Sequence, residues 1–281
     1  MWCAFDLHDL QYVAVKIHRP KSSWKDEEQA KYIKYVRREY AIHCGVNHPN
    51  ILPCYGKIEL GEYFGENSFG TVLEYCEGTD LSAILDDKKR LPEGHARVIL
   101  LQILSGMQYL SSPSADRKRR GVIHYDLKPG NILIDGEGNA KITDFGLSKI
   151  VVPDAGDSLE LTSLGAGTVW YLPPECFPDE DEERVLISNK VDVWSIGVIF
   201  FEMLYGEVPY GLDRHGRKKA QDRIKREKTI VLEAQEELRF PINPNTSDGA
   251  KNFIRACLTF DPKKRRDMNK LCEHEYVTSS M

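Results

Sequence analysis

The stretch that decides the fold runs from Val122 to Gly146 and reads V-I-H-Y-D-L-K-P-G-N-I-L-I-D-G-E-G-N-A-K-I-T-D-F-G. It begins with a short β-branched strand at Val122–Ile123 and continues through a polar loop. Two further apolar runs, Ile132–Ile134 and Ala140–Ile142, flank the turn Asp135–Gly138, which is a hairpin pattern. We therefore predict a strand, a polar loop and a β-hairpin, in this order.

Four polar side chains lie between and after these strands: Asp126, Lys128, Asn131 and Asp144. Because they follow the ends of neighbouring strands, we expect them to converge on one spot. Two carboxylates, an amide oxygen and an ammonium group suit a hydroxyl, a phosphate and Mg²⁺, which is a hard cation that prefers oxygen ligands. The alternative interpretation is an ordinary polar loop beside a hairpin.

The composition is that of an ordinary globular protein. The chain has 281 residues, of which 29% are charged and 41% are hydrophobic. That length suits one large domain or two lobes around a cleft. A formal net charge of -5 argues against general nucleic-acid binding, which usually shows a strongly basic balance.

The seven cysteines are scattered and include no C-x-x-C pair. An odd number of cysteines without metal or disulfide spacing favours a reducing compartment. The N-terminus contains no apolar core of a signal peptide. The longest apolar run, Ile196–Phe201, is too short to span a membrane. We therefore expect a soluble, intracellular protein that is not secreted.

The motif H-Y-D-L-K-P-G-N at His124–Asn131, followed by D-F-G at Asp144–Gly146, resembles the catalytic loop and the metal-binding motif of eukaryotic protein kinases, with H-Y-D in place of H-R-D. Two such motifs in the right order around one hairpin are a specific signal. The resemblance implies an α+β, bilobal protein-kinase-like fold with a small, mostly β N-lobe and a larger, mostly α C-lobe. It makes residues 1–281 one kinase domain, with a truncated N-lobe at 1–75, a hinge at 76–80 and a C-lobe at 81–281.

Two segments of the N-lobe carry further residues of the kinase pattern. The β-branched run Gln11–His18 predicts a strand with Lys16 near its end, and in V-A-V-K this lysine resembles the residue that grips the α- and β-phosphates. The apolar spacing over Lys25–Cys44 predicts a helix that carries Glu39, the natural ion-pair partner of that lysine. Taken alone, Lys16 would be a solvated edge residue and Glu39 part of a solvated helix face.

The segment Thr71–Asp80, T-V-L-E-Y-C-E-G-T-D, resembles the hinge between the lobes of a kinase. An extended hinge offers backbone N–H and C=O groups to an adenine edge, here from Glu74 and Cys76. Leu73 would then lie at the back of the pocket, and Asp80 could reach a ribose hydroxyl. Without the resemblance, Glu74 and Asp80 would be ordinary surface acids. The nucleotide-binding residues that the resemblance implies are Ala14, Lys16, Glu39, Glu74, Cys76, Asp80 and Leu133.

By this resemblance the cofactors are ATP and Mg²⁺, and the reaction is transfer of the γ-phosphoryl group to a protein hydroxyl. Asp126 accepts or orients the hydroxyl proton, and Lys128 neutralises charge on the migrating phosphoryl group. Asn131 and Asp144 hold Mg²⁺. The catalytic residues that the resemblance implies are Asp126, Lys128 and Asn131. The D-L-K-P context of Lys128 matches serine/threonine kinases rather than tyrosine kinases.

The C-lobe supplies residues that support the catalytic loop in kinases. Thr168, in a segment that ends P-P-E where kinases have A-P-E, is expected to bond the aspartate and the lysine of that loop. A helix beginning at Asp192 is apolar nearly all round, which implies full burial, and Asp192 would bond the loop's backbone. By the same resemblance, Arg265 is expected to pair with Glu175.

Three other stretches give weaker signals. Gly65–Val72 nearly matches a phosphate-covering G-x-G-x-x-G-x-V loop, but it follows Lys16 instead of preceding it, so we interpret it as a hairpin connection. The basic run Arg117–Arg120 fits a nuclear-localisation patch or, more simply, a solvated insertion. The charged stretch Asp213–Lys228 is most simply a solvated helix or insertion.

The Tousled-like kinases are the family that the motifs resemble most. The matching stretches are V-L-E-Y-C-E-G, H-Y-D-L-K-P-G-N-I-L, I-T-D-F-G-L-S-K-I, G-A-G-T-V-W-Y-L-P-P-E-C-F and S-N-K-V-D-V-W-S-I-G-V-I-F-F. Tyr125, in place of the usual arginine, and the run Trp170–Pro174 are the most diagnostic features. The resemblance implies a serine/threonine kinase linked to chromatin regulation, located in the nucleus or otherwise the cytoplasm. It implies a protein substrate, by family a histone chaperone, with no direct nucleic-acid or membrane partner.

The chain opens at residues that align with the second strand of a kinase N-lobe, so we expect a truncated form of a longer kinase, whose first strand and glycine-rich loop are missing from this sequence. The upstream coiled-coil segments through which the family oligomerises are also not in this sequence. The alternative is a pseudokinase-like binding or scaffold module with impaired ATP handling. Retention of Lys16, Asp126, Asn131 and Asp144 favours the kinase, because a scaffold needs none of them. Tyr125 removes the usual arginine contact to an activation-loop phosphate, which predicts activity that depends less on one loop phosphorylation.

Overall fold

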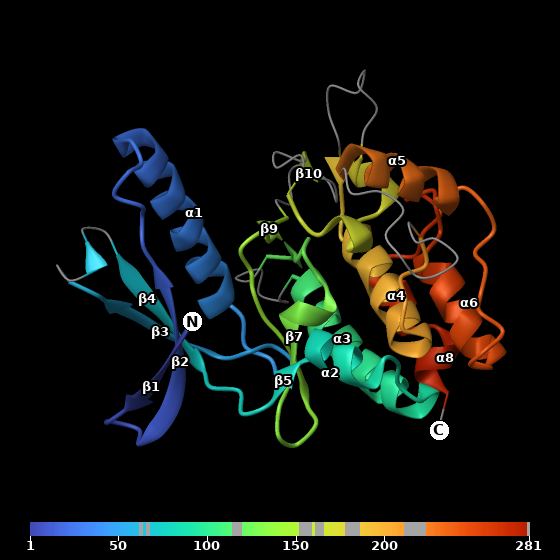
Figure 1. Cartoon of the computed structure of the whole chain (residues 1–281), viewed down its shortest axis with the longest axis horizontal. Coiled ribbons are helices and arrows are strands. Elements are labelled where there is room, and N and C mark those ends of the chain that lie inside the picture. Colours follow the sequence, from blue (N-terminus) through green and yellow to red (C-terminus); the bar gives the residue numbers. More distant parts are fainter. Residues whose placement is uncertain are drawn as a thin grey trace.

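The computed structural model describes residues 1–61, 64–65, 68–113, 120–151, 159–160, 166–177, 186–210 and 223–279. Within these residues, a small β-sheet with one long helix lies beside a larger and mainly helical part (Figure 1). This is the bilobal α+β arrangement that the sequence predicts. The predicted basic run at 117–119, residues 66–67 of the near-match to a glycine loop, and positions 213–222 of the charged stretch lie outside the described residues.

The small lobe is built on a four-stranded antiparallel sheet with the order β1-β2-β4-β3. Its strands are β1 (Trp2–Asp6), β2 (Gln11–His18), β3 (Cys54–Glu59) and β4 (Phe69–Glu74). Val13 and Val15 of β2 are buried, so their neighbours Ala14 and Lys16 point to the opposite face, as the period of two in a strand requires. Ile51, three residues before β3, forms an isolated bridge with Ile142.

Helix α1 (Asp26–Cys44) crosses beside this sheet and carries Glu39. Its first turn is acidic, which complements the positive end of the helix dipole. The helix ends where the N–H of Gly45 bonds the carbonyl of Ile42. Val36 and Ile42 are buried, and Glu39 is only 8% exposed. The predicted helix is thus confirmed, and its glutamate faces the interior rather than solvent.

Strand β5 (Thr79–Asp80) and helix α2 (Leu81–Lys88) lead from the sheet into the large lobe. Asp80 caps α2, because its side chain accepts a hydrogen bond from the N–H of Ala83 at 2.9 Å. The sequence pattern does not predict this helix. Only Leu81 and Leu85 are buried in it, and one apolar pair over eight residues is too short a pattern to indicate a helix.

Helices form the core of the large lobe. They are α3 (Glu93–Ser111), α4 (Lys190–Tyr205), α5 (Arg223–Ala234), α6 (Asp248–Cys257), α7 (Met268–Cys272) and α8 (Glu275–Thr278). Helix α4 is buried nearly all round, as predicted, and begins two residues before Asp192. Across the ranges that the structure describes, none of the helices combines the length and apolar character needed to cross a bilayer.

The opening stretch of the sequence forms the strands that we predicted. They are β6 (Val122–Ile123), β7 (Ile132–Ile134) and β8 (Ala140–Ile142). β7 and β8 form the hairpin, and β5 pairs with the outer edge of β7. β6 pairs with β9 (Lys149–Ile150), which brings both ends of the stretch together. Strands β10 (Leu159–Glu160) and β11 (Leu186–Ile187) form a separate pair.

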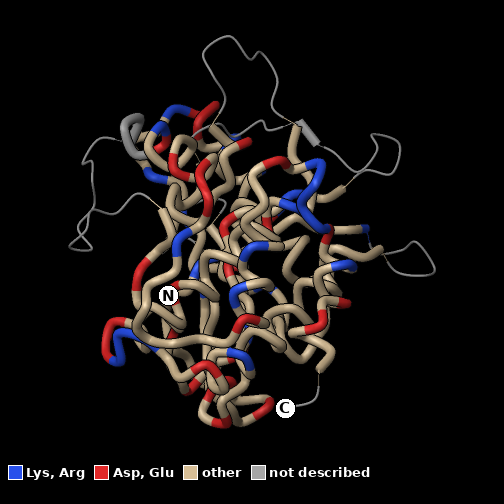
Figure 2. Tube along the Cα trace, turned by 90° about the vertical axis from the view of Figure 1, so that its right-hand side faces the viewer, with Lys and Arg blue, Asp and Glu red and all other residues tan. Residues whose placement is uncertain are grey.

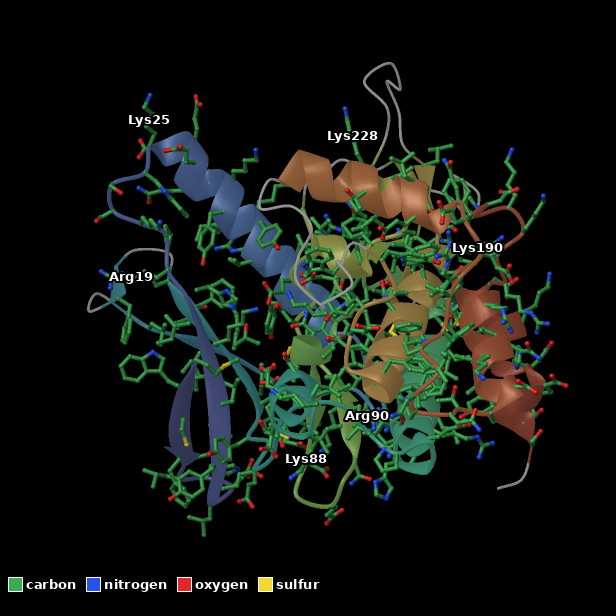
Figure 3. The ribbon with its side chains drawn as sticks, turned by 45° about the vertical axis from the view of Figure 1, so that its right-hand side comes forward. Arg19, Lys25, Lys88, Arg90, Lys190 and Lys228 are labelled. Atoms are coloured by element: carbon green, nitrogen blue, oxygen red, sulfur yellow. A yellow bond between two sulfur atoms is a disulfide. The ribbon has the colours of Figure 1, made fainter. Side chains whose placement is uncertain are left out.

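Charged residues of both signs are interspersed over the described trace (Figure 2). Figure 3 shows Lys25 at the start of α1 and Lys228 on α5 pointing away from the molecule. This mixture agrees with the modest net charge of -5.

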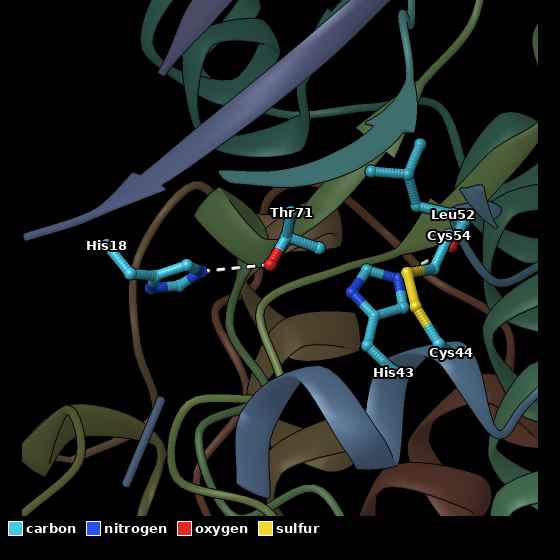
Figure 4. The surroundings of a disulfide bond; sticks show 6 residues. All are labelled: His18, His43, Cys44, Leu52, Cys54 and Thr71. Carbon is cyan, nitrogen blue, oxygen red and sulfur yellow. Dashed lines mark hydrogen bonds between the residues drawn. A yellow bond between two sulfur atoms is a disulfide. The ribbon is translucent and has the colours of Figure 1, made fainter. Parts of the chain in front are cut away.

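The structure corrects the expectation about disulfides. Cys44, the last residue of α1, and Cys54, the first residue of β3, form a disulfide with their Cα atoms 5.0 Å apart (Figure 4). No cysteine motif marks this pair, since the ten-residue separation is closed by the tertiary fold of the segment 45–53. All seven cysteines belong to the described residues, and the other five are free thiols.

Candidate active site

A cavity of about 420 Å³ lies where the sheet, α1 and the β7–β8 hairpin meet. Eight of the residues predicted to bind nucleotide or metal line it: Ala14, Lys16, Glu39, Glu74, Cys76, Asn131, Leu133 and Asp144. Leu73, predicted at the back of the pocket, is also part of the wall. These residues come from five separate segments of the chain, so the fold brings the predicted set around one space.

Lys16 forms ion pairs with two carboxylates in this cavity. Its Nζ donates to Oε1 of Glu39 and, at 2.9 Å, to Oδ1 of Asp144. These contacts tie β2 to α1 and to the loop that follows β8. The predicted Lys16–Glu39 pair is therefore present, and it includes Asp144 as a third member.

Lys16, Glu39 and Asp144 influence one another's pKa values. Burial alone would lower the pKa of Lys16, but the charges of Glu39 and Asp144 outweigh burial and raise it. Burial opposes ionisation of Asp144, yet the charge of Lys16 holds the pKa of that carboxyl below its usual range. For Glu39, burial outweighs the attraction of Lys16, and its pKa is raised. Asp144 is therefore the more firmly ionised of the two carboxylates.

The loop that contains Asp126 and Lys128 forms a second cluster of hydrogen bonds, with Thr168. Oδ1 of Asp126 accepts from the N–H of Thr168 at 3.0 Å and from its hydroxyl at 2.9 Å. Nζ of Lys128 donates to Oδ2 of Asp126 at 2.9 Å and to Oγ1 of Thr168 at 3.0 Å. The expected bonds from Thr168 to both residues are thus confirmed. Neither Asp126 nor Lys128 lines the cavity itself.

Asn131 joins this cluster to the cavity. Its Nδ2 donates to the backbone carbonyl of Asp126 at 2.8 Å, so its amide oxygen remains the acceptor on the other side of the group. Asn131 and Asp144 both line the cavity and present oxygen atoms there, which are the ligands that Mg²⁺ prefers. The donor set therefore fits a magnesium ion beside the phosphates of a nucleotide.

Two residues of the site have an unusual backbone. Tyr125 and Asp144 have φ angles of 69° and 64°, and this left-handed region costs a residue other than glycine about 1–2 kcal/mol. Asp192, which is 1% exposed, accepts from the N–H groups of His124 and Tyr125 at 2.8 and 2.9 Å. This is the predicted contact, and it holds the loop in its strained form.

Two predicted nucleotide residues have roles in the structure that the sequence did not indicate. Oδ1 of Asp80 caps α2, and Asp80 does not line the cavity. The carboxylate of Glu74 pairs with Nζ of Lys141 on β8, and the N–H of Glu74 donates to the carbonyl of Pro53 at 3.0 Å. A purine edge could therefore meet Glu74 only at its backbone carbonyl.

His43 lines the cavity although no sequence motif indicates it. Its ring lies 4.6 Å from that of Phe145, and its Nε2 donates to the carbonyl of Leu52 at 2.7 Å. Burial lowers its pKa to about 4, so the ring is neutral at pH 7. Its position four residues after Glu39 is the available signal, because such residues share a helix face.

The predicted pair in the large lobe is also present. Arg265, which is 1% exposed, donates from Nη1 and Nη2 to the two carboxylate oxygens of Glu175 at 2.6 and 3.0 Å. A two-pronged contact of this kind fixes both groups in one geometry. It ties the P-P-E segment that follows Thr168 to the residues between α6 and α7.

A two-lobed fold with a cavity at the lobe junction, a lysine–glutamate pair and an aspartate–lysine–threonine cluster is the organisation of a protein kinase domain. The model of the protein kinase domain family matches residues 3–277, and the chain belongs to this family.

Among curated proteins, the chain is similar to the serine/threonine-protein kinase TOUSLED of Arabidopsis thaliana, with 44% identity over 279 residues. It is 46% identical over 283 residues to serine/threonine-protein kinase tousled-like 1 of Homo sapiens. Both matches cover 99% of this chain but only 38% and 35% of the relatives. The chain thus spans less than two fifths of their length, and over that part its resemblance to the Tousled-like kinases is confirmed.

Proposed function

We propose that this chain transfers the γ-phosphoryl group of ATP to serine and threonine hydroxyls of proteins. The observation that carries the proposal is the cluster of Asp126, Lys128 and Thr168, which Asn131 links to the cavity that holds the ion pairs of Lys16. A carboxylate that accepts a hydroxyl proton, next to a cation that meets the phosphoryl group, is the arrangement that this transfer needs.

The nucleotide would occupy the cavity with its phosphates toward Lys16. Glu39 orients that ammonium group, so little reorganisation is needed when the phosphates arrive. Glu74 and Cys76 offer backbone groups to the adenine edge, and Ala14 and Leu133 supply apolar walls. In this proposal the segment 76–80 is the hinge between the lobes at 1–75 and 81–281.

Asp126 positions the acceptor hydroxyl and takes its proton. Both of its carboxylate oxygens are held, one by Thr168 and the other by Lys128, so the group keeps one orientation. Asn131 and Asp144 would hold Mg²⁺, which supplies neutralisation of phosphate charge when it is bound. Besides Mg²⁺, Lys128 supplies a positive charge next to Asp126, which takes the proton. Positioning and electrostatics together are the main sources of rate in this chemistry.

The role in the cell follows from the Tousled-like motifs and belongs to the same proposal. We infer a protein substrate of the histone-chaperone class, a nuclear location and a part in chromatin regulation. The alternative, a binding module with impaired ATP handling, is less favoured because Lys16, Glu39 and Asp144 are already assembled. A scaffold would not require that arrangement.

The test is phosphoryl transfer from γ-labelled ATP to casein as a general protein acceptor, followed by analysis of the labelled amino acids. We expect phosphoserine and phosphothreonine, and loss of labelling in Lys16→Met, which lacks the ammonium group. Label on tyrosine, or equal labelling by Lys16→Met, would overturn the proposal.

A further inference from the structure

The disulfide between Cys44 and Cys54 joins the helix and the sheet that form the nucleotide cavity. Cys44 ends α1, and Cys54 begins β3. Both residues are partly exposed, so a small thiol or disulfide reagent can reach them. Of the cysteines in the chain, all of which are described, only these two are bonded to each other.

The bridge acts on elements that carry the site. Glu39 precedes Cys44 by five residues, which is about 7.5 Å along the helix axis. Cys54 pairs in register with Leu73 of β4, and Leu73 lines the cavity. His43, next to Cys44, bonds the carbonyl of Leu52 on the other side of the bridge (Figure 4). The covalent link therefore joins two segments whose neighbouring residues, among them His43 and Leu52, line the cavity, although neither cysteine lines it.

The other contacts that hold this end of α1 are not covalent. They are the His43–Leu52 hydrogen bond, the Lys16–Glu39 pair and a bond of 2.5 Å from Nη2 of Arg38 to the carbonyl of Ser148. Hydrogen-bonded contacts of this kind open locally at a cost well below that of global unfolding. A covalent bridge limits such opening because it removes conformations of the opened chain.

Three of the five remaining thiols have a raised pKa. Burial raises the pKa of the thiols of Cys176 and Cys257, and it raises that of Cys272 to about 11. These three stay protonated near neutral pH and are poor nucleophiles. A chain that keeps five free thiols suits reducing surroundings, where a disulfide is usually transient or redox-sensing.

We propose that Cys44 and Cys54 are a site of reversible oxidation whose disulfide locks α1 with Glu39 against Lys16. Oxidation then raises the affinity of the cavity for nucleotide, and reduction lowers it. This inference deepens the proposed function, since it rests on the cavity being a nucleotide site. The oxidant is a low-molecular-weight disulfide of the oxidised-glutathione class.

The exchange balances in two steps. One cysteine thiolate attacks oxidised glutathione, forms a mixed disulfide and releases one glutathione. The second cysteine thiolate then attacks the protein sulfur of that mixed disulfide and releases the other glutathione. Two electrons pass from the cysteines to oxidised glutathione, and their two protons end on the two glutathione thiols.

The experiment compares the wild-type chain with Cys44→Ser and Cys54→Ser in reduced and in oxidised glutathione buffers. Cys3→Ser is the matched control, because Cys3 is exposed and lies outside the bridge. After alkylation, peptide mapping shows whether the two cysteines are linked, with a mass lower by two hydrogen atoms. Titration with Mg·ATP gives the affinity, and hydrogen exchange reports the opening of residues 36–44.

We expect oxidised wild type and Cys3→Ser to form the bridge and to bind Mg·ATP roughly fivefold more tightly than their reduced forms. Their thermal midpoint should rise on the order of 5 °C, and the amides of 36–44 should exchange more slowly. Neither single variant of the pair should respond. Free or separately glutathionylated thiols in oxidised wild type would overturn the inference, and so would a bridge without change in affinity or exchange.

Failure of the proposed function is distinguishable from failure of this inference. The bridge and the protection of α1 are measured without phosphoryl transfer. A chain that binds Mg·ATP in a redox-dependent manner but labels no protein would contradict only the kinase activity. A chain that labels protein equally in both buffers, with equal affinity, would contradict only the redox site.

Discussion

The carboxylate of Asp192 accepts a hydrogen bond from the N–H of Tyr125 at 2.9 Å, and Tyr125 has a φ of 69°. The second oxygen of Asp192 accepts from the N–H of His124. A buried residue of the most buried helix thus holds the backbone turn that directly precedes Asp126. The position of the Asp126 carboxylate, the proposed proton acceptor, depends on this contact from the core.

Asp192→Ala should therefore impair both stability and activity. Two buried N–H groups lose their acceptor, which costs about 1–3 kcal/mol for each group. The turn at Tyr125 would relax, and kcat should fall while the KM for ATP changes little. Urea denaturation and steady-state kinetics measure the two effects. Asp248→Ala, at an exposed position of α6, is the control, and identical behaviour of the two variants would refute the role of Asp192.

The loss of ATP binding and of kcat/KM at low pH should reflect the protonation of Glu39. Its pKa is raised by burial, whereas that of Asp144 is lowered by Lys16. As the pH falls, Glu39 therefore takes up its proton first and releases Lys16, while Asp144 stays ionised. Glu39→Gln should weaken ATP binding overall and move the acid limb of kcat/KM to lower pH. An acid limb at the same pH in both proteins would show that another group controls it.

Thr168 should matter through its hydroxyl. Thr168→Val keeps the shape and the backbone N–H but removes the group that bonds Asp126 and Lys128. Leaving these partners unsatisfied should lower kcat about tenfold, since a lost hydrogen bond of this kind costs about 1–2 kcal/mol. Thr168→Ser is the matched control and should keep activity within about threefold of wild type. Equal kcat values for the valine and serine variants would contradict this role.

The pair of Arg265 and Glu175 should stabilise the large lobe. Glu175→Ala leaves the buried guanidinium without its carboxylate, and removing one partner of a buried pair typically costs about 3–5 kcal/mol. Lys264→Ala, which breaks only an exposed contact to Asp261, should cost less than about 1 kcal/mol. The measurement is the free energy of unfolding of the two variants in urea, each compared with wild type. A loss in Glu175→Ala no larger than that in Lys264→Ala would show that the pair contributes little.

The catalytic loop and hairpin could be predicted because their signals are local. The turn Asp135–Gly138 lies between two apolar runs, and the polar residues of the loop occur at short, fixed spacing. The burial of α4 was equally clear, since its sequence is apolar on every side. The Lys16–Glu39 pair is less local, and the family resemblance supplied it.

Other features could not be predicted because they depend on the tertiary path of the chain. The Cys44–Cys54 disulfide forms only because the segment 45–53 folds back from the helix onto the sheet. The cap that Asp80 forms on α2 is a local contact, but no helix was predicted there, so the sequence indicated only the ribose role, which stays a prediction. The carboxylate of Glu74 pairs with Lys141, a contact that no motif indicated, while the backbone role predicted for Glu74 stays a prediction. For the disulfide and for the Glu74 carboxylate, a neighbour in space that no motif marks determines the contact.

The most direct test of the central claim is the rate of phosphoryl transfer by Asp126→Asn. The variant keeps the size of the side chain but lacks the carboxylate that accepts the hydroxyl proton. We predict that labelling of protein serine and threonine from γ-labelled ATP falls about 10²- to 10⁴-fold, while Mg·ATP affinity stays within about twofold of wild type. Labelling by Asp126→Asn at the wild-type rate would contradict the assignment of this chain as a protein kinase that acts through Asp126.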